Sequence, residues 1–150
     1  LSLINKTYLP RSSARRANGS DYADDIELLG VGLEKPLTGW LSATGRGFAA
    51  WRGGAGGYAE GLLGLTARAD AWPRVALIAA LEGGAAGGGG IDVDSGLIGQ
   101  GSVGARFAAT DRLAIGLEVG AMDAVRGSFA ATVLALSLTW TFDRAVSAGD

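Results

Sequence analysis

The chain contains no cysteine and no histidine among its 150 residues. Their absence excludes disulfides, thiolate zinc sites, and nucleophiles or bases built on these two side chains. Lysine is scarce too, because only two of the 13 basic residues, Lys6 and Lys35, are lysine. With 13 basic against 15 acidic residues, the charge balance indicates neither a nucleic-acid partner nor an anionic surface as a partner.

Long hydrophobic runs are also missing. A membrane-spanning helix needs about 20 apolar residues, and glycine, arginine or glutamate interrupts every candidate run. Charged residues make up 19% of the chain, against about 25% in an ordinary soluble domain. Glycine is abundant instead, with 26 copies, so the composition indicates a protein that does not need a charged surface all round. The chain opens with neither methionine nor a signal-peptide pattern, so we expect a processed or trimmed product.

Alternation with period two runs through most of the chain and predicts β-strands. The clearest case is the stretch 131–142, in which Leu134, Leu136 and Leu138 share one face with Trp140 and Phe142. These strands are longer than the usual five or six residues, and about 9 to 11 tilted residues can cross a bilayer. Seven strands are predicted between residues 26 and 142, and an eighth at the N-terminus, over residues 2–9, 26–34, 40–51, 57–69, 74–82, 98–110, 112–122 and 131–142.

Two of these predictions have alternatives. The stretch 74–81 follows Asp70 and Pro73 and could open a short helix instead of a strand. If residues 1–9 are not a strand, seven strands cannot close in the usual even number. The barrel would then be shared between chains, or the N-terminal segment would pair with a neighbouring subunit.

The connections between the predicted strands differ systematically in length. With eight strands, the three short connections, 35–39, 70–73 and 110–112, all fall at one end, and the longer ones fall at the other. This pattern predicts an all-β fold, an antiparallel up-and-down β-barrel of eight strands. The predicted organisation is an N-terminal strand and long polar loop over residues 1–25, the barrel over 26–143, and a C-terminal tail over 144–150.

One face of the predicted strands carries charges of both signs among glycine and alanine. Eight charges among such small side chains make a poor water-facing surface, so we expect them inside, as a charge-neutral network that occludes the lumen. A regulated pore through the same network is the alternative. Arginines on the same face should keep the glutamates ionised, which argues against acid-base catalysis, so we expect no enzyme activity. The predicted lumen network consists of Glu34, Arg46, Glu60, Arg68, Arg74, Glu82, Arg106 and Glu118.

The opposite face carries leucine, valine, isoleucine and alanine, with aromatic residues near the strand ends. Amphipathic rings favour the headgroup level of a membrane, so these residues predict a pair of aromatic girdles. The predicted girdle residues are Trp40, Trp51, Trp72, Trp140 and Phe142.

Over residues 26–142 the alternating close "LALSLTWTF", the preceding segment "RLAIGLEVGAM" and the turn asymmetry resemble the small eight-stranded outer-membrane β-barrels of Gram-negative bacteria, the porin-like family. The resemblance implies an outer-membrane location, a lipid-bilayer partner and a structural or surface-adhesive role. Members of that family usually end on an aromatic residue that the assembly machinery reads, whereas here "DRAVSAGD" follows Phe142. The family's enzymes that trim lipid A rely on histidine, which this chain lacks.

The glycine run within residues 83–96 matches no phosphate-binding motif, because it lacks the Lys-Ser/Thr pair of a P-loop. We expect a flexible external loop there. Asp92 and Asp94 weakly suggest a calcium site, but the later ligands of a calcium loop are missing, so no metal or cofactor is expected.

Two other functions compete with the membrane barrel. One is a soluble or extracellular β-barrel that forms oligomers or filaments through its N-terminal segment and glycine-rich surfaces, with Leu134, Leu136 and Leu138 in its core. The other is a lipocalin-like carrier with an apolar ligand cavity. No small-molecule substrate can be identified, and self-association is compatible with either location.

Overall fold

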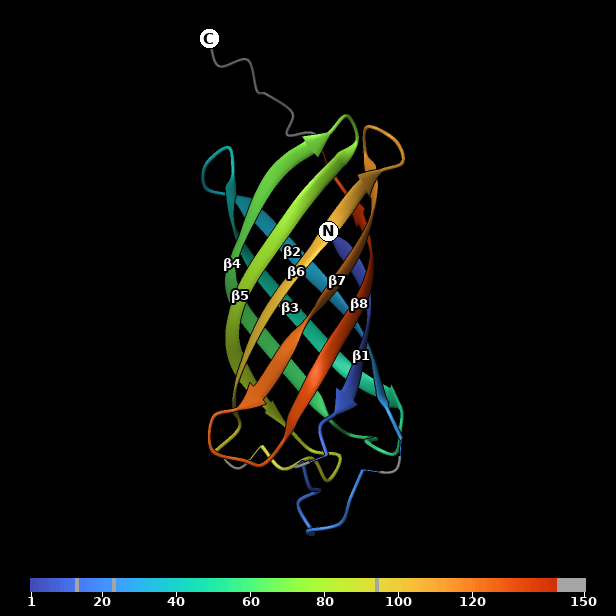
Figure 1. Ribbon diagram of the computed structural model, residues 1–150, viewed down its shortest axis with the longest axis vertical. Helices are drawn as coiled ribbons and strands as arrows, with labels where there is room; N and C mark the ends of the chain where they lie inside the picture. The colour runs from blue at the N-terminus through green and yellow to red at the C-terminus, as the bar shows by residue number, and fades with distance from the viewer. Residues whose placement is uncertain (13, 23, 94, 143–150) are drawn as a thin grey trace.

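The computed structural model describes residues 1–12, 14–22, 24–93 and 95–142 and is a closed antiparallel β-barrel (Figure 1). The predicted fold class and strand number are confirmed. No helix in the described residues is long and apolar enough to span a membrane. The eight strands are β1 (Ser2–Pro10), β2 (Ile26–Pro36), β3 (Leu41–Arg52), β4 (Ala59–Trp72), β5 (Val75–Gly87), β6 (Leu97–Ala108), β7 (Leu113–Ala124) and β8 (Ala130–Trp140).

The N-terminal strand closes the barrel. β1 pairs with β2 from Ser2↔Gly32 to Tyr8↔Ile26, and on its other side with β8 from Ser2↔Thr139 to Pro10↔Ala131. The predicted eighth strand therefore lies in the same barrel, and the alternative of an N-terminal segment outside it is wrong. The stretch 74–81 lies in β5 apart from its first residue, so the alternative of a short helix is wrong as well.

The connections sort to the two ends as their lengths predict (Figure 1). We call the upper end in the figure, where β2–β3, β4–β5 and β6–β7 join, the turn end. The opposite end, with the four longer connections, is the loop end. Two of the short turns are stabilised by a threonine hydroxyl that accepts a backbone N–H three residues later. Thr38 Oγ1 accepts that of Leu41 at 3.1 Å, and Thr110 Oγ1 accepts that of Leu113 at 3.0 Å.

The longer connections fold over the loop end and close it with apolar side chains. Phe129 is 1% exposed and packs edge-on against Tyr8 and Tyr22, with ring centroids 5.5 and 5.4 Å apart. Ile91 and Val93, from the connection after the glycine run, are buried in the same cluster. The loop predicted there thus contributes two apolar side chains to the core.

The glycine run makes this packing possible. Gly88 and Gly89 have φ angles of +90° and +63°, in the region that favours glycine. A Cβ at Gly88 would lie 2.2 Å from the carbonyl oxygen of Gly57, and one at Gly89 would lie 2.5 Å from that of Ala55. The run is needed because two connections cross in close contact at this point.

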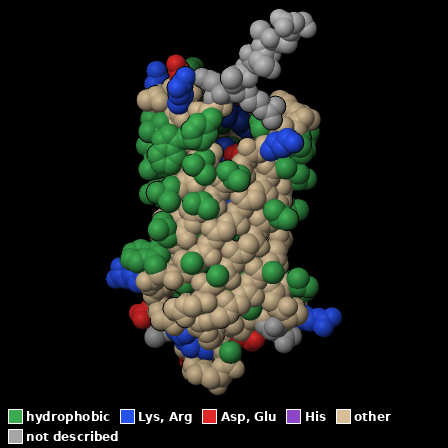
Figure 2. Space-filling view, turned by 180° about the vertical axis from the view of Figure 1, so that it is seen from behind, with side chains coloured by type: hydrophobic (Ala, Val, Ile, Leu, Met, Phe, Trp, Pro, Cys, Tyr) green, Lys and Arg blue, Asp and Glu red, His purple; other side chains and the backbone are tan. Residues whose placement is uncertain are grey.

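The two faces of the barrel wall differ sharply in character. Leu134, Leu136 and Leu138 of β8 point outward and are exposed, while Ala135 and Ser137 between them are buried. In total 25 large hydrophobic side chains are exposed among the described residues. Figure 2 shows hydrophobic side chains over the visible face of the wall, with charged ones mainly near the two ends.

Candidate functional site

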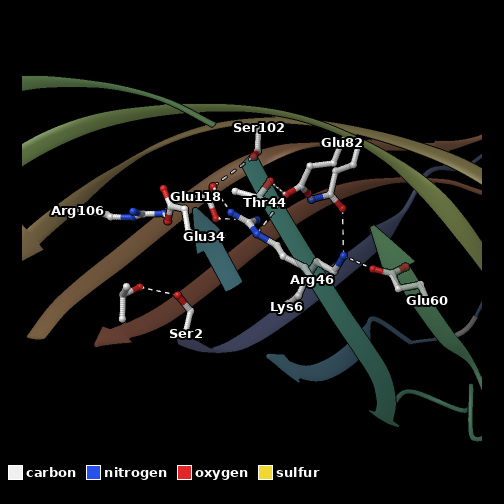
Figure 3. Close-up of polar contacts among 12 residues, drawn as sticks. Ser2, Lys6, Glu34, Thr44, Arg46, Glu60, Glu82, Ser102, Arg106 and Glu118 are labelled. Atoms are coloured by element: carbon white, nitrogen blue, oxygen red, sulfur yellow. Dashed lines mark hydrogen bonds and ion pairs between the residues drawn. The ribbon is translucent and has the colours of Figure 1, made fainter. Parts of the chain in front are cut away.

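The polar groups of this protein gather in the lumen, and the group nearest the loop end is centred on Glu60 of β4 (Figure 3). Lys6, which reaches it from β1, forms an ion pair with Glu60 Oε1 and donates a hydrogen bond to Gln100 Oε1 at 3.1 Å. The other carboxylate oxygen accepts hydrogen bonds from the hydroxyls of Tyr8 at 2.6 Å and Tyr58 at 2.7 Å. Both oxygens of a fully buried carboxylate are thus satisfied, as burial of a charge requires.

Aromatic rings complete the surroundings of the buried ammonium group. Lys6 Nζ lies 3.9 Å from the ring centroid of Phe48 and 4.9 Å from that of Tyr8, within reach of cation–π attraction. Burial, and then the nearby Glu60 carboxylate, raise the pKa of the Tyr58 hydroxyl far above its usual value. Tyr58 therefore stays protonated and keeps donating to Glu60.

The second group lies at the next level toward the turn end and is organised by Arg46 of β3 (Figure 3). Its guanidinium bonds two carboxylates from different strands, with Nε 3.1 Å from Glu82 Oε1 and a terminal nitrogen 3.2 Å from Glu118 Oε2. Ser102 Oγ donates to Glu118 at 3.4 Å, and Thr44 Oγ1 donates to Glu82 at 3.5 Å. The planar fork of arginine can serve both acids at once, which a lysine ammonium could not do in the same geometry.

A third group lies closest to the turn end. Arg106 of β6 pairs with Glu34 of β2 at 2.9 Å, and both side chains keep some solvent contact, at 15% and 22% exposure. Beside them the hydroxyls of Ser2 and Thr139 are hydrogen-bonded at 2.8 Å across the β1–β8 seam. From the loop end to the turn end, the lumen side chains thus change from apolar, to buried and ionic, to ionic and partly exposed.

Glycines on the neighbouring strand provide the space for these charged side chains. Gly64 pairs with Glu82, and Gly104 pairs with Glu118. A Cβ at Gly64 would lie 2.8 Å from Glu82 Cγ and 2.1 Å from a backbone oxygen, and a Cβ at Gly104 would meet Glu118 Cγ at 2.9 Å. The mixture of glycine and glutamate on one face is therefore a packing arrangement, in which each carboxylate stem crosses a position without a side chain.

Six of the eight residues predicted for the lumen lie in these groups, namely Glu34, Arg46, Glu60, Glu82, Arg106 and Glu118. Arg68 and Arg74 do not join them. Both are exposed at the turn end, where Arg68 pairs with Asp70 at 3.1 Å. Among the described residues inside the barrel, four glutamates face Lys6, Arg46 and Arg106, so this set has one acidic side chain in excess, whereas a charge-neutral lumen is predicted.

Sequence reasoning missed Lys6, Tyr8, Tyr58 and Gln100, which surround Glu60. Alternation within residues 2–9 places Ser2, Lys6 and Tyr8 on one face, and this signal could have found the lysine. The same alternation places Tyr58 on the face of Glu60 and Gln100 on the face of Arg106, so both were predictable as inward-facing residues although the predicted network omits them.

The predicted aromatic residues are all exposed, but they do not form two equal girdles. Trp40 lies in the β2–β3 turn, while Trp72 and Trp140 end β4 and β8, with Phe142 just beyond. These four are at the turn end. Trp51 alone is at the loop end, where its indole nitrogen donates to Asn5 Oδ1 at 3.3 Å.

Asp92, one of the two residues that weakly suggest a calcium site, lies in a loop-end connection. An Asp92 carboxylate oxygen accepts the backbone N–H of Ser128 at 3.0 Å, which holds two connections together at the loop end. Asp94 lies outside the described residues. Within the described part of the chain, no three His, Cys, Asp or Glu side chains gather in a way that could hold a metal ion.

Comparison with known proteins finds no matching family model, no similar characterised protein and no similar solved structure.

Proposed function

We propose that this protein spans a bacterial outer membrane as a non-catalytic structural barrel, with lipid around its wall and an occluded, ion-paired lumen. The observation that carries the proposal is that the usual distribution of side chains is inverted, with apolar side chains on the outside and charged ones in the centre. Leu117 and Leu136 face outward and are exposed, while Lys6 and Glu60 are 1% and 0% exposed in the centre. In water the exposed leucines would be unfavourable, whereas in lipid they are favourable and the lumen keeps the charged side chains away from hydrocarbon.

The apolar surface has the height that a bilayer requires. On β5 the outward positions from Val75 to Gly87 carry only valine, leucine, alanine and glycine. Twelve residue steps at about 3.3 Å each, tilted by about 40°, give about 30 Å across the membrane. The apolar band of known outer-membrane barrels is about 25 Å tall, so β5 is long enough.

Polar and amphipathic groups mark both edges of this band. At the turn end, Trp40, Trp72 and Trp140 place indole rings where headgroups would lie. At the loop end, the wall carries Asn5 bonded to Trp51, and Arg52 lies 4.0 Å from Glu27. The short turns would face the periplasm and the longer connections the outside, as in other outer-membrane barrels.

The soluble oligomer or filament is not favoured. That alternative needs Leu134, Leu136 and Leu138 in the core and the arginines and glutamates in water, which is opposite to their placement. The lipocalin-like carrier needs an apolar lumen, whereas here Arg46 and its carboxylate partners fill the centre. Self-association and a surface-adhesive role of the loops stay predictions.

The lumen supports a structural role more than a conducting or catalytic one. Among the described residues, Thr66 Oγ1 is the buried side-chain polar atom that lacks a hydrogen-bond partner. The carboxylates bond arginine, lysine or hydroxyl donors, which opposes proton transfer and stabilises the closed wall from within.

The experiment is reconstitution. The barrel should stay dispersed in detergent, precipitate when detergent is removed, and float with phospholipid vesicles on a density gradient. Leu117→Arg, in the middle of β7, should lower the free energy of unfolding in vesicles by about 2–4 kcal/mol. Leu37→Arg, in the β2–β3 turn, is the matched control and should change it by less than about 1 kcal/mol. A monodisperse chain at high concentration in plain buffer would contradict the proposal.

A further inference from the structure

A cavity of about 410 Å³ opens at the turn end of the lumen, which is within the size range of small-molecule sites. Small inward-facing side chains on its wall, Ala108 and Ala114, leave the space free. Figure 2 shows an opening near the top of the barrel, with acidic and basic side chains visible inside it. The loop end, by contrast, is closed by the cluster around Phe129, so this cavity is reached from the turn end.

The lining of the cavity is rich in arginine. Its lining includes Arg68, Arg74, Arg106 and Arg112 against Asp70 and Asp111. Arg106 also bonds Glu34, which does not line the cavity, and Arg68 bonds Asp70. Arg112 is engaged in an interaction as well, so Arg74 is the arginine of the lining that no described acidic side chain pairs. Guanidinium groups bind oxyanions in a bidentate manner, so such a lining suits an anionic group.

Arg74 is the most informative of the four. It follows Pro73 in the β4–β5 turn and has φ +99°, which is the geometry that a type II turn normally gives to glycine. A non-glycine residue there is strained, and such strain is common where a side chain has a function. No acidic side chain in the described ranges 1–12, 14–22, 24–93 and 95–142 forms an ion pair with Arg74. The turn therefore holds an uncompensated guanidinium at the cavity wall.

Hydroxyl groups complete the lining. Thr110 Oγ1 accepts backbone N–H groups from Arg112 at 3.2 Å and Leu113 at 3.0 Å, so its own hydrogen is free to be donated. Thr139 and Thr141 also line the cavity. Guanidinium and hydroxyl donors thus line the same cavity.

We propose that the turn-end cavity binds a phosphate group, with Arg74 as its principal recognition residue. Arginine binds phosphate oxygens in a bidentate manner, and a phosphate group would pair the Arg74 guanidinium, which no described acidic side chain pairs. The group could belong to free phosphate or to the headgroup of a lipid, because the turn end would lie at the membrane surface.

The test titrates inorganic phosphate into the purified barrel in a maltoside detergent at low salt, with binding followed by ³¹P NMR. Saturable binding is expected, and Arg74→Gln should weaken it about tenfold. Lys35→Gln is the matched control, because Lys35 is an exposed basic residue at the same end that does not line the cavity. Ala108→Leu fills the cavity without changing a charge and should abolish binding. Circular dichroism reports whether each variant keeps the barrel.

A parallel titration with dihexanoyl phosphatidic acid identifies the source of the phosphate group. Binding much tighter than that of inorganic phosphate assigns the site to lipid headgroups, and equal affinity assigns it to free phosphate. In either case Arg74→Gln must weaken binding. The proposal is overturned if no saturable binding occurs, or if Arg74→Gln binds phosphate as tightly as Lys35→Gln does. Because this test is done in detergent, a negative result leaves the membrane proposal to its own experiment.

Discussion

Lys6 on β1 and Glu60 on β4 form an ion pair across the lumen, between two strands that are not neighbours in the barrel. Their side chains are 1% and 0% exposed. β1 is the strand that closes the barrel, so this pair ties the closing strand to the opposite wall. The pair therefore links the stability of the N-terminal strand to that of the whole barrel.

The first prediction concerns this pair. Lys6→Met should lower the free energy of unfolding by about 3–5 kcal/mol, because it leaves a buried carboxylate without its cation. Urea unfolding in vesicles, followed by tryptophan fluorescence, measures the change. Lys35→Met removes an exposed lysine and should be within about 0.5 kcal/mol of the parent protein. A double-mutant cycle with Glu60→Gln should show that the two losses are far from additive, and additive losses would refute the coupling.

Arg46 carries the second prediction, because one guanidinium serves two buried carboxylates. Arg46→Gln should destabilise the barrel by about 3–5 kcal/mol. Adding Glu82→Gln and Glu118→Gln should restore part of this loss, since both orphaned charges are then removed. Thermal unfolding of the single and triple variants, compared in one detergent, decides the matter. A triple variant less stable than Arg46→Gln alone would show that unpaired charge is not the cause.

The third prediction tests the space left by lumen glycines. Gly104→Ala should cost about 1–3 kcal/mol or more, because its Cβ would lie 2.0 Å from the carbonyl oxygen of Leu117. Gly47→Ala is the matched control on the outer face, where an added Cβ meets nothing within 4 Å. Its unfolding midpoint should stay within the error of the parent protein. Equal effects of the two substitutions would mean that glycine in the lumen has no packing role.

Arg74 gives the fourth prediction. Arg74→Gly should raise the free energy of unfolding by about 1 kcal/mol, because glycine adopts φ +99° without strain. The same variant should lose phosphate affinity. A stability gain together with a binding loss is the expected outcome of a side chain kept for function, and an unchanged or lowered unfolding midpoint would argue that the turn is not strained.

Alternation was sufficient to predict the fold and the contents of the two faces. Leu134, Leu136 and Leu138 lie outside and Glu60, Glu82 and Glu118 inside because side-chain direction in a strand has a strict period of two. Assigning the charged face to the outside would have reversed the orientation of every side chain in the wall. The eight charges among small residues were the feature that indicated which face lies inside.

The position of each inward side chain along the barrel axis was not predictable in the same way. Arg68 is on the inward face of β4, but it lies close enough to the turn end to be solvated. Which carboxylate meets which cation depends on the stagger between strands and on reach across the lumen, and neither appears in the sequence of a single strand. For that reason Lys6 was missed as the partner of Glu60. The packed glycine connection was missed because burial of Ile91 depends on other loops.

The most direct test of the central claim is the environment of outward leucines in phospholipid vesicles. The chain has no cysteine, so Leu117→Cys and Ala17→Cys each provide one site for a nitroxide spin label, in the middle of the wall and in the long β1–β2 connection. The proposal predicts that the label at position 117 collides with oxygen and is protected from a water-soluble nickel chelate, while the label at position 17 shows the reverse. Equal access of the nickel chelate to both labels would contradict it.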